Sequence, residues 1–144
     1  MTFFIKLLFF VFLATVTSAT WAIEPSEKVK VTPVLKTQNN WYGDAIVYPQ
    51  GQAEVTVVVV ELAPGGETGW HYHPVPSVGM LLEGEIEVEF EEGEIKHLAA
   101  GEAAAEAVNV LHNGHNRGEV PAKLVVIYTG TTDLPLTVQQ HTQD

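Results

Sequence analysis

Hydrophobic and polar residues alternate in short blocks along the chain, and these blocks predict strands rather than helices. The clearest block covers residues 85–90, where Ile86, Val88 and Phe90 alternate with three glutamates. A period of two places the apolar side chains on one face of a strand and the glutamates on the other. We therefore expect the apolar face to point into a core and the acidic face to meet water.

Two longer blocks are apolar without strict alternation. Residues 53–62 contain the run Val-Thr-Val-Val-Val-Val, which is too apolar on both faces for an exposed strand. This run predicts a central strand that is covered on both sides. Residues 123–129 predict the last strong strand. Shorter strands are expected at residues 44–48, 78–82 and 94–98.

Turn signals separate the blocks about every 8 to 12 residues, which is typical of an all-β sandwich or barrel. Segment 102–107 is the exception, because its sequence Glu-Ala-Ala-Ala-Glu-Ala is rich in strong helix formers. The segment is short, however, and lies between Gly101 and the β-type residues 108–110. A helix of about six residues is too short to be stable alone, so we predict β structure here as well.

The first 22 residues have the layout of a secretory signal peptide. Lys6 is followed by an almost entirely apolar run over residues 7–16, and the small residues Ser18, Ala19 and Ala22 come next. This layout predicts cleavage after Ala22 or Ala19. An uncleaved membrane anchor is the alternative, although the run is shorter than the roughly 20 residues of a spanning helix.

The chain of 144 residues has room for one folded domain. After a signal peptide at residues 1–22, we expect an N-terminal arm over residues 23–43. The β-barrel should then cover residues 44–130, and a C-terminal tail should follow over residues 131–144. With a cleaved signal, the protein is predicted to be periplasmic or secreted.

Charge and cysteine content narrow the range of partners and chemistries. The chain carries 7 basic and 18 acidic residues, for a net charge of −11, and loss of residues 1–22 removes only Lys6. The resulting negative field repels phosphate backbones and anionic lipids, so we expect neither nucleic-acid binding nor stable membrane association after cleavage. The chain has no cysteine, so any metal must be held by nitrogen and oxygen ligands.

Two histidines form the clearest candidate site. His71 and His73 follow the glycine-rich turn at residues 65–69 and are separated by one residue. On a strand, this spacing points both imidazoles to the same side, where they can bind one metal ion. His112 lies downstream as a third possible ligand, and the question is whether the three imidazoles converge.

The spacing of these residues resembles the first signature motif of the cupin superfamily. Gly65, His71, His73 and Gly84 stand at the motif's positions, and Ser77 stands where the family has a glutamate. Cupins are small jelly-roll β-barrels that often hold a metal inside the barrel.

The second cupin motif follows in the expected order. Gly101, His112 and Asn116 match it, while Ala107 replaces a proline and Asn109 replaces a glycine. Together the two motifs make the resemblance cover roughly residues 53 to 128. It implies an all-β fold, a cupin-type β-barrel of the jelly-roll kind.

The resemblance implies that His71, His73 and His112 are metal ligands. Three neutral imidazoles with open positions suit Mn, Fe, Ni, Cu or Zn, so a divalent transition metal is the expected cofactor. The neutral hydroxyl of Ser77 is a poor substitute for the missing carboxylate. Its presence implies an additional open position and a more Lewis-acidic or more weakly held ion. The alternative is a set of hydrogen-bonded barrel histidines without a metal.

Glu106 is the residue that could replace the missing carboxylate. If residues 104–112 continue as one strand, Glu106 shares a face with His112 and acts as a ligand or a catalytic base. The alternative is a solvent-exposed glutamate. Leu81 and Val110 are expected to line an apolar pocket near the metal. No role is expected for the remaining histidines, His97, His115 and His141.

Two functions remain open at this point. The first is a metal-dependent enzyme acting on a small organic molecule, such as an oxygenase on an enolic or phenolic substrate or an isomerase, with Glu106 or bound hydroxide as base. The second is a non-catalytic secreted module that binds a small ligand or a metal. Cupins commonly pair, so a homodimer is also expected.

Overall fold

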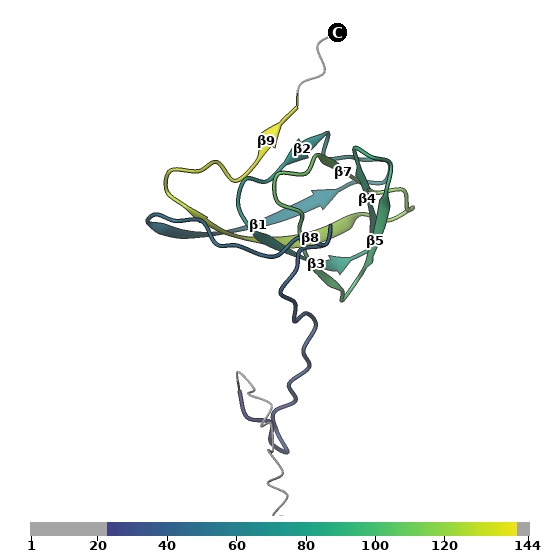
Figure 1. Ribbon diagram of the computed structural model, residues 1–144. Helices are drawn as coiled ribbons and strands as arrows, with labels where there is room; N and C mark the ends of the chain where they lie inside the picture. The colour runs from purple at the N-terminus through teal and green to yellow at the C-terminus, as the bar shows by residue number, and fades with distance from the viewer. Residues whose placement is uncertain (1–22, 141–144) are drawn as a thin grey trace, which may run out of the picture. The chain divides into compact units, whose positions relative to one another are not determined.

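The computed structural model describes residues 23–140 (Figure 1). The predicted signal peptide, residues 1–22, and His141 lie outside the described residues. The described residues belong to two separate compact units, which divide between Thr32 and Pro33. Within residues 23–140, no helix is long and apolar enough to cross a membrane.

The described residues from Pro33 onward contain strands and no helix. The strands are β1 (Ala53–Leu62), β2 (His71–Tyr72), β3 (Ser77–Glu83), β4 (Glu85–Phe90), β5 (Ile95–Ala99), β6 (Ala103–Ala105), β7 (His112–His115), β8 (Ala122–Thr131) and β9 (Val138–Gln139).

These strands form two antiparallel sheets. One sheet has the order β1-β8-β3-β6 and the other has the order β5-β4-β7-β2-β9. Figure 1 shows β1, β8 and β3 forming one layer, with β2, β7, β4 and β5 facing it. Leu81, Phe90 and Val126, which are almost fully buried, lie in the core between the layers. The predicted jelly-roll β-barrel is therefore confirmed.

The alternating block behaves as its pattern predicts. Ile86, Val88 and Phe90 of β4 are buried in the core, while Glu85, Glu87 and Glu89 are exposed or partly exposed. Segment 102–107 also forms a strand rather than a helix, since β6 pairs with β3. Tertiary pairing overrides the helix propensity of its alanines.

The prediction for β1 was wrong in one respect. The strand is not central and covered on both sides, because it lies at the edge of its sheet and pairs with β8 alone. Val58 and Val60 pack against the core, but Val55, Val57 and Val59 are 65%, 58% and 57% exposed. An apolar sequence shows that a strand favours burial. Whether another strand or layer covers it depends on the rest of the fold.

The C-terminal segment returns to the histidine-bearing strand. In β9, Gln139 pairs with His71 and Val138 pairs with Tyr72 of β2. Leu136, just before β9, packs against the core cluster. This return brings main-chain atoms of the tail beside the candidate site.

Candidate metal centre

The fold brings the three predicted histidines together. His71 in β2 lies directly opposite His112 in β7, and His73 follows β2, where it bridges to Val108. All three are buried, with 7%, 6% and 3% exposure for His71, His112 and His73. One ring nitrogen of each lies within 4.8 Å of those of the other two. The cluster therefore has the size of a site for one ion.

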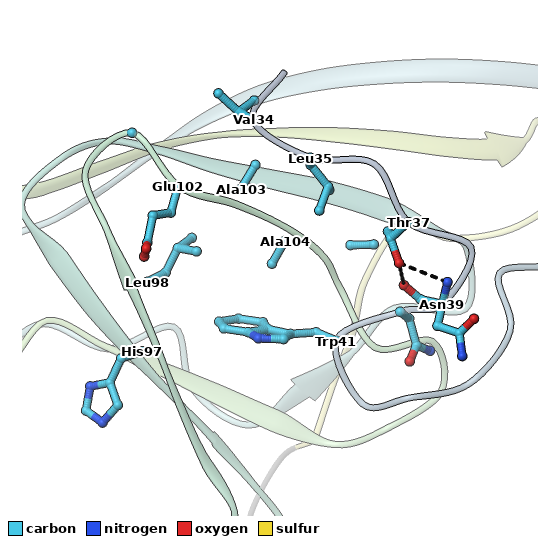
Figure 2. Close-up of a pocket in the computed structure, with 13 residues that line it drawn as sticks. Val34, Leu35, Thr37, Asn39, Trp41, His97, Leu98, Glu102, Ala103 and Ala104 are labelled. Carbon is cyan, nitrogen blue, oxygen red and sulfur yellow. Dashed lines mark hydrogen bonds between the residues drawn. The ribbon is translucent and has the colours of Figure 1, made fainter. Parts of the chain in front are cut away.

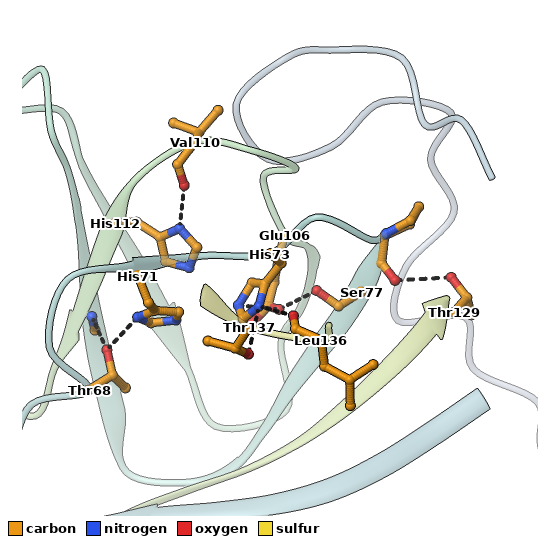
Figure 3. Close-up of polar contacts among 12 residues, drawn as sticks. Thr68, His71, His73, Ser77, Glu106, Val110, His112, Thr129, Leu136 and Thr137 are labelled. Atoms are coloured by element: carbon orange, nitrogen blue, oxygen red, sulfur yellow. Dashed lines mark hydrogen bonds and ion pairs between the residues drawn. The ribbon is translucent and has the colours of Figure 1, made fainter. Parts of the chain in front are cut away.

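Main-chain carbonyls fix the orientation of all three imidazoles, and Figure 3 shows the two that hold His73 and His112. The Nδ1 contacts are to Gly69 O for His71 (2.7 Å), to Leu136 O for His73 (2.9 Å) and to Val110 O for His112 (2.8 Å). A carbonyl oxygen only accepts hydrogen bonds, so each Nδ1 carries the hydrogen and each Nε2 keeps its lone pair. This tautomer leaves Nε2 of each ring available to bind a metal.

Burial keeps at least two of these imidazoles neutral. It lowers the pKa of His73 to about 4, against a smaller raising effect of the bond to Leu136 O. Burial likewise lowers the pKa of His112 to about 4. At these two positions a metal would therefore meet neutral donors at pH 7 and would displace no proton.

Glu106 lies beside the histidine cluster, but not for the predicted reason. Residues 104–112 do not continue as one strand, because the chain turns at Asn109, whose φ is 57°. β6 and β7 consequently belong to different sheets. The side chain of Glu106 nevertheless points inward, and its Oε2 lies 3.5 Å from Nε2 of His73. The solvent-exposed alternative is wrong, since only 18% of this side chain is exposed.

Ser77 and Glu106 act as a pair. The Ser77 hydroxyl, at the start of β3, donates a hydrogen bond to the Glu106 carboxylate (Figure 3). Burial raises the pKa of Glu106, and the Ser77 hydrogen bond and the nearby imidazoles of His112 and His71 partly offset this effect. The position where the cupin motif has a glutamate thus holds the serine that anchors a carboxylate from elsewhere in the chain.

The carboxylate lies beside the histidine cluster rather than within it. The set of mutually close donor atoms contains His71, His73 and His112 but not Glu106. The Glu106 carboxylate therefore lies next to the histidine cluster, within reach of Nε2 of His73.

Sequence reasoning missed the role of Gly79. A Cβ at this position would lie 3.1 Å from Oε1 of Glu106, so a side chain there would press on the carboxylate. The available signal was a glycine inside the apolar strand 78–82, which often marks the close approach of another group.

The expected pocket lining was partly wrong. The central cavity is bounded by the histidines and by apolar residues of both sheets, among them Val60, Ile86 and Val126. Leu81 and Val110 do not line it. Leu81 packs in the core instead, and Val110 contributes its carbonyl to His112 rather than its side chain.

The other described histidines lie apart from the cluster. The side chain of His97 is 72% exposed, with Nδ1 3.8 Å from a Glu87 oxygen. His115 contacts Glu67 and Glu89, each at 3.3 Å. Neither belongs to the group of metal-ligating atoms formed by the three buried histidines.

Fold and site together define a small jelly-roll barrel with a buried cluster of three histidines. Residues 58–128 match the family model described as Cupin domain. This match supports a relationship of residues 58–128 to the cupin superfamily. A search of curated proteins gives no match.

Solved structures share the fold of this chain. An uncharacterized conserved protein with a double-stranded β-helix domain from Klebsiella pneumoniae is 22% identical, with a TM-score of 0.53 over 83% of this chain and 86% of that one. An oxalate oxidase is 27% identical, with a TM-score of 0.51 over 59% of this chain and 45% of that one. The DMSP lyase DddQ from Ruegeria pomeroyi is 21% identical, with a TM-score of 0.52 over 60% and 43%. The chain thus spans less than half of the oxidase and lyase chains.

Proposed function

We propose that this protein binds a divalent transition metal through the Nε2 atoms of His71, His73 and His112. The observation that carries the proposal is that a main-chain carbonyl accepts a hydrogen bond from Nδ1 of each histidine. These bonds leave the three Nε2 lone pairs free beside one another in a buried site. Hydrogen-bonded barrel histidines without a metal would not need all three rings in this tautomer.

The donor set fits a metal with open coordination positions. Three neutral nitrogen ligands and no thiolate suit Mn, Fe, Ni, Cu or Zn. When bound, such an ion polarises an oxygen-containing group of a substrate or activates a small molecule. The carboxylate of Glu106 adds negative charge next to the site without occupying a position among the three histidines.

We further propose that the protein is an enzyme, an oxygenase or an isomerase acting on a small organic molecule. Glu106 would serve as the base, taking a proton from the substrate at Oε2 and returning it later. Burial raises its pKa, and a raised pKa makes the carboxylate a stronger base. The 27% identity to an oxalate oxidase gives modest support to oxygen chemistry.

One observation favours the alternative, a non-catalytic module that binds a metal or a small ligand. The central cavity has a volume of only about 70 Å³, whereas pockets for organic ligands usually measure about 300 to 1,000 Å³. Without a structural change, the cavity admits only molecules of the size of water or a small anion.

Metal analysis of protein purified without a histidine tag tests the metal site. We expect one equivalent of a single metal among Mn, Fe, Ni, Cu and Zn in the wild type, and its loss in His112→Ala. The matched control is His97→Ala, which removes an exposed histidine and should retain the metal. Equal metal content in His112→Ala and the wild type would contradict the proposal.

Oxygen uptake and product analysis separate the enzyme from the binding module. The metal-loaded protein is incubated with catechol, a flavonol and oxalate, and Glu106→Gln is tested in parallel. The enzyme proposal expects turnover that Glu106→Gln abolishes while the metal stays bound. A full metal content with no turnover of any substrate would favour the binding module.

Export from the cytoplasm is a further part of the proposal. The apolar run over residues 7–16 and the small residues after it support cleavage after Ala22 or Ala19. Protein recovered from the periplasm or the medium should therefore begin at Ile23 or Thr20, as checked by its intact mass. Recovery with Met1 retained in the membrane fraction would support the uncleaved anchor. A homodimer also stays a prediction, which the mass in solution tests.

A further inference from the structure

Cavity sizes in the barrel raise the question of how an organic molecule reaches the site. The central cavity measures about 70 Å³, and a second inner pocket beside His112 measures about 30 Å³. A water molecule needs roughly 10 to 15 Å³ of cavity, so each space holds only a few waters. A much larger groove of about 470 Å³ lies on the surface.

The groove is lined by both apolar and polar side chains (Figure 2). The indole of Trp41 lies along it, near the apolar side chains of Leu98 and Ala104. Glu102 and His97 supply polar groups at the edge. The flat indole suits a planar ring, and the polar groups suit a ligand with hydroxyl groups. The net charge of −11 disfavours a strongly anionic ligand.

Trp41 lines both the surface groove and the inner pocket. On the inner side, the same pocket is bounded by Phe90, Glu106 and His112. The Trp41 side chain therefore stands between the groove and the face of the site that carries the proposed base and one of the proposed ligands. Removing or moving this one side chain would join the two spaces.

The loop that carries Trp41 is internally fixed. We call residues 38–46 the Trp41 loop. The Asn40 side chain accepts hydrogen bonds from three main-chain N–H groups of the loop, those of Tyr42 (3.1 Å), Gly43 (2.9 Å) and Asp44 (2.9 Å). Asn40 N–H also donates to Asp44 O at 2.8 Å. These bonds favour movement of the loop as one body rather than by unfolding.

A small set of contacts fastens this loop to the barrel. Trp41 N–H donates to the carbonyl of Ala105, the residue before Glu106, at 2.6 Å. The Tyr42 ring packs on Phe90 with centroids 5.2 Å apart, and its hydroxyl donates to Glu92 at 3.0 Å. The loop is thus attached directly next to Glu106, so its displacement opens the inner pocket at the proposed base.

We infer that the groove is the docking site for a small, planar, hydroxylated organic molecule, and that Trp41 is the wall that controls its passage to His112 and Glu106. Trp41 is then a specificity-determining residue, because it sets the size of molecule that reaches the metal. This inference rests on the proposed metal-dependent function. The inference explains how an organic substrate could reach the site although the inner cavities have room only for water molecules.

Chemical labelling of the metal-free protein tests the wall without requiring a metal. Diethylpyrocarbonate modifies neutral imidazoles, and mass spectrometry gives the rate at each histidine. In Trp41→Ala we expect labelling of His112 to rise at least about 10-fold, as for a site that becomes open locally. Trp41→Phe should keep the wall and the slow rate. His115, which lines neither the groove nor the inner pocket, is the internal control, and its rate should not change.

The labelling rates of the three buried histidines distinguish local opening at Trp41 from a general destabilisation of the fold. The inner pocket is lined by His112 and not by His71 or His73, so labelling of those two should rise much less. An equal rise at all three in Trp41→Ala would indicate a loosened fold and overturn the inference. An unchanged rate at His112 would also overturn it, since entry would then lie elsewhere.

A second measurement tests size selection in cobalt-loaded protein. Azide is small and 4-nitrocatechol is planar and larger, and the absorption spectrum reports the binding of either. Trp41→Ala should speed nitrocatechol binding at least about 10-fold while changing azide binding less than about 2-fold. Equal effects on both probes would contradict size control by Trp41. If the protein takes up no cobalt, the metal proposal fails, and histidine labelling still decides the question of the wall.

Discussion

The candidate site has two sides that are built in different ways. On the histidine side, main-chain carbonyls of Gly69, Leu136 and Val110 hold the three Nδ1 atoms. On the carboxylate side, Glu106 is held by the hydroxyl of Ser77 and lies near Nε2 of His73. One side depends on backbone geometry and the other on a single pair of side chains.

Under the proposed function, this difference gives the two sides separate tasks. Ligands fixed by the backbone keep their orientation with or without an ion, which favours a preformed metal site. A carboxylate fixed by one hydroxyl can turn, which suits a group that must reach a substrate and exchange a proton. Mutations on the two sides should therefore affect metal affinity and turnover differently.

The largest effect is expected on the histidine side. His73→Ala removes one of three proposed ligands and should weaken metal binding by more than about 100-fold, because changes in outer-shell partners alone cost about 10 to 100-fold. Titration of the metal-free protein with Zn or Co, followed by calorimetry, measures this change. His97→Ala is the matched control. Retention of near wild-type affinity by His73→Ala would show that this residue is not a ligand.

Removing the charge of Glu106 should lower turnover more than it lowers metal affinity. Glu106→Gln keeps the size of the side chain and should lower turnover by about 100-fold, the low end of the contribution of a general base. Metal affinity should fall by less than about 10-fold, because Glu106 is not in the donor cluster. Steady-state kinetics and metal titration measure the two quantities. A loss of metal equal to that of His73→Ala would make Glu106 a ligand instead.

The sequence predicted the histidine side better than the carboxylate side. His71 and His73 share a face because a strand alternates with a period of two, and this rule needs no tertiary information. The carbonyl of Leu136 that holds His73 comes from 63 residues away in the chain, and no local pattern indicates it. Alternation within β4 and turn spacing were likewise sufficient for the all-β fold.

The reason why Glu106 faces inward could not be predicted from the sequence. The parity argument assumed a continuous strand, and the left-handed turn at Asn109 broke it. Glu106 faces inward because β6 pairs with β3, which places its carboxylate beside Ser77. A contact between side chains 29 residues apart depends on sheet order, as does the exposure of Val57 on the edge strand β1.

A smaller effect is expected from pH on the metal-free protein. His73 and His112 have pKa values of about 4 when folded and about 6.5 when unfolded, so the unfolded chain binds more protons between these values. The free energy of unfolding should therefore fall as pH falls from about 6.5 to about 4, by on the order of 1 to 3 kcal/mol per histidine. Urea denaturation at several pH values measures it.

Titration of Glu106 should stabilise the fold as pH falls, in contrast to titration of the two histidines. The Glu106→Gln variant therefore serves as a control for the pH prediction. The pKa of Glu106 is raised on folding, so just above the ordinary value the folded state binds a proton that the unfolded state lacks. That proton stabilises the fold as pH falls. In Glu106→Gln this contribution is absent, and the acid-induced loss of stability should be steeper than in the wild type. A shallower dependence would contradict the raised pKa.

The smallest expected effects are on the free energy of unfolding, and they compare the side-chain anchor of Glu106 with the backbone anchor of His73. Ser77→Ala removes the hydroxyl that holds Glu106 and should destabilise the metal-free protein by about 1 to 2 kcal/mol, since a buried carboxylate loses its donor. Thr137→Val removes a hydroxyl 3.1 Å from Nδ1 of His73, which still donates to Leu136 O. It should cost less than about 0.5 kcal/mol. If urea denaturation gave Thr137→Val the larger loss, side chains rather than the backbone would be fixing the histidine side.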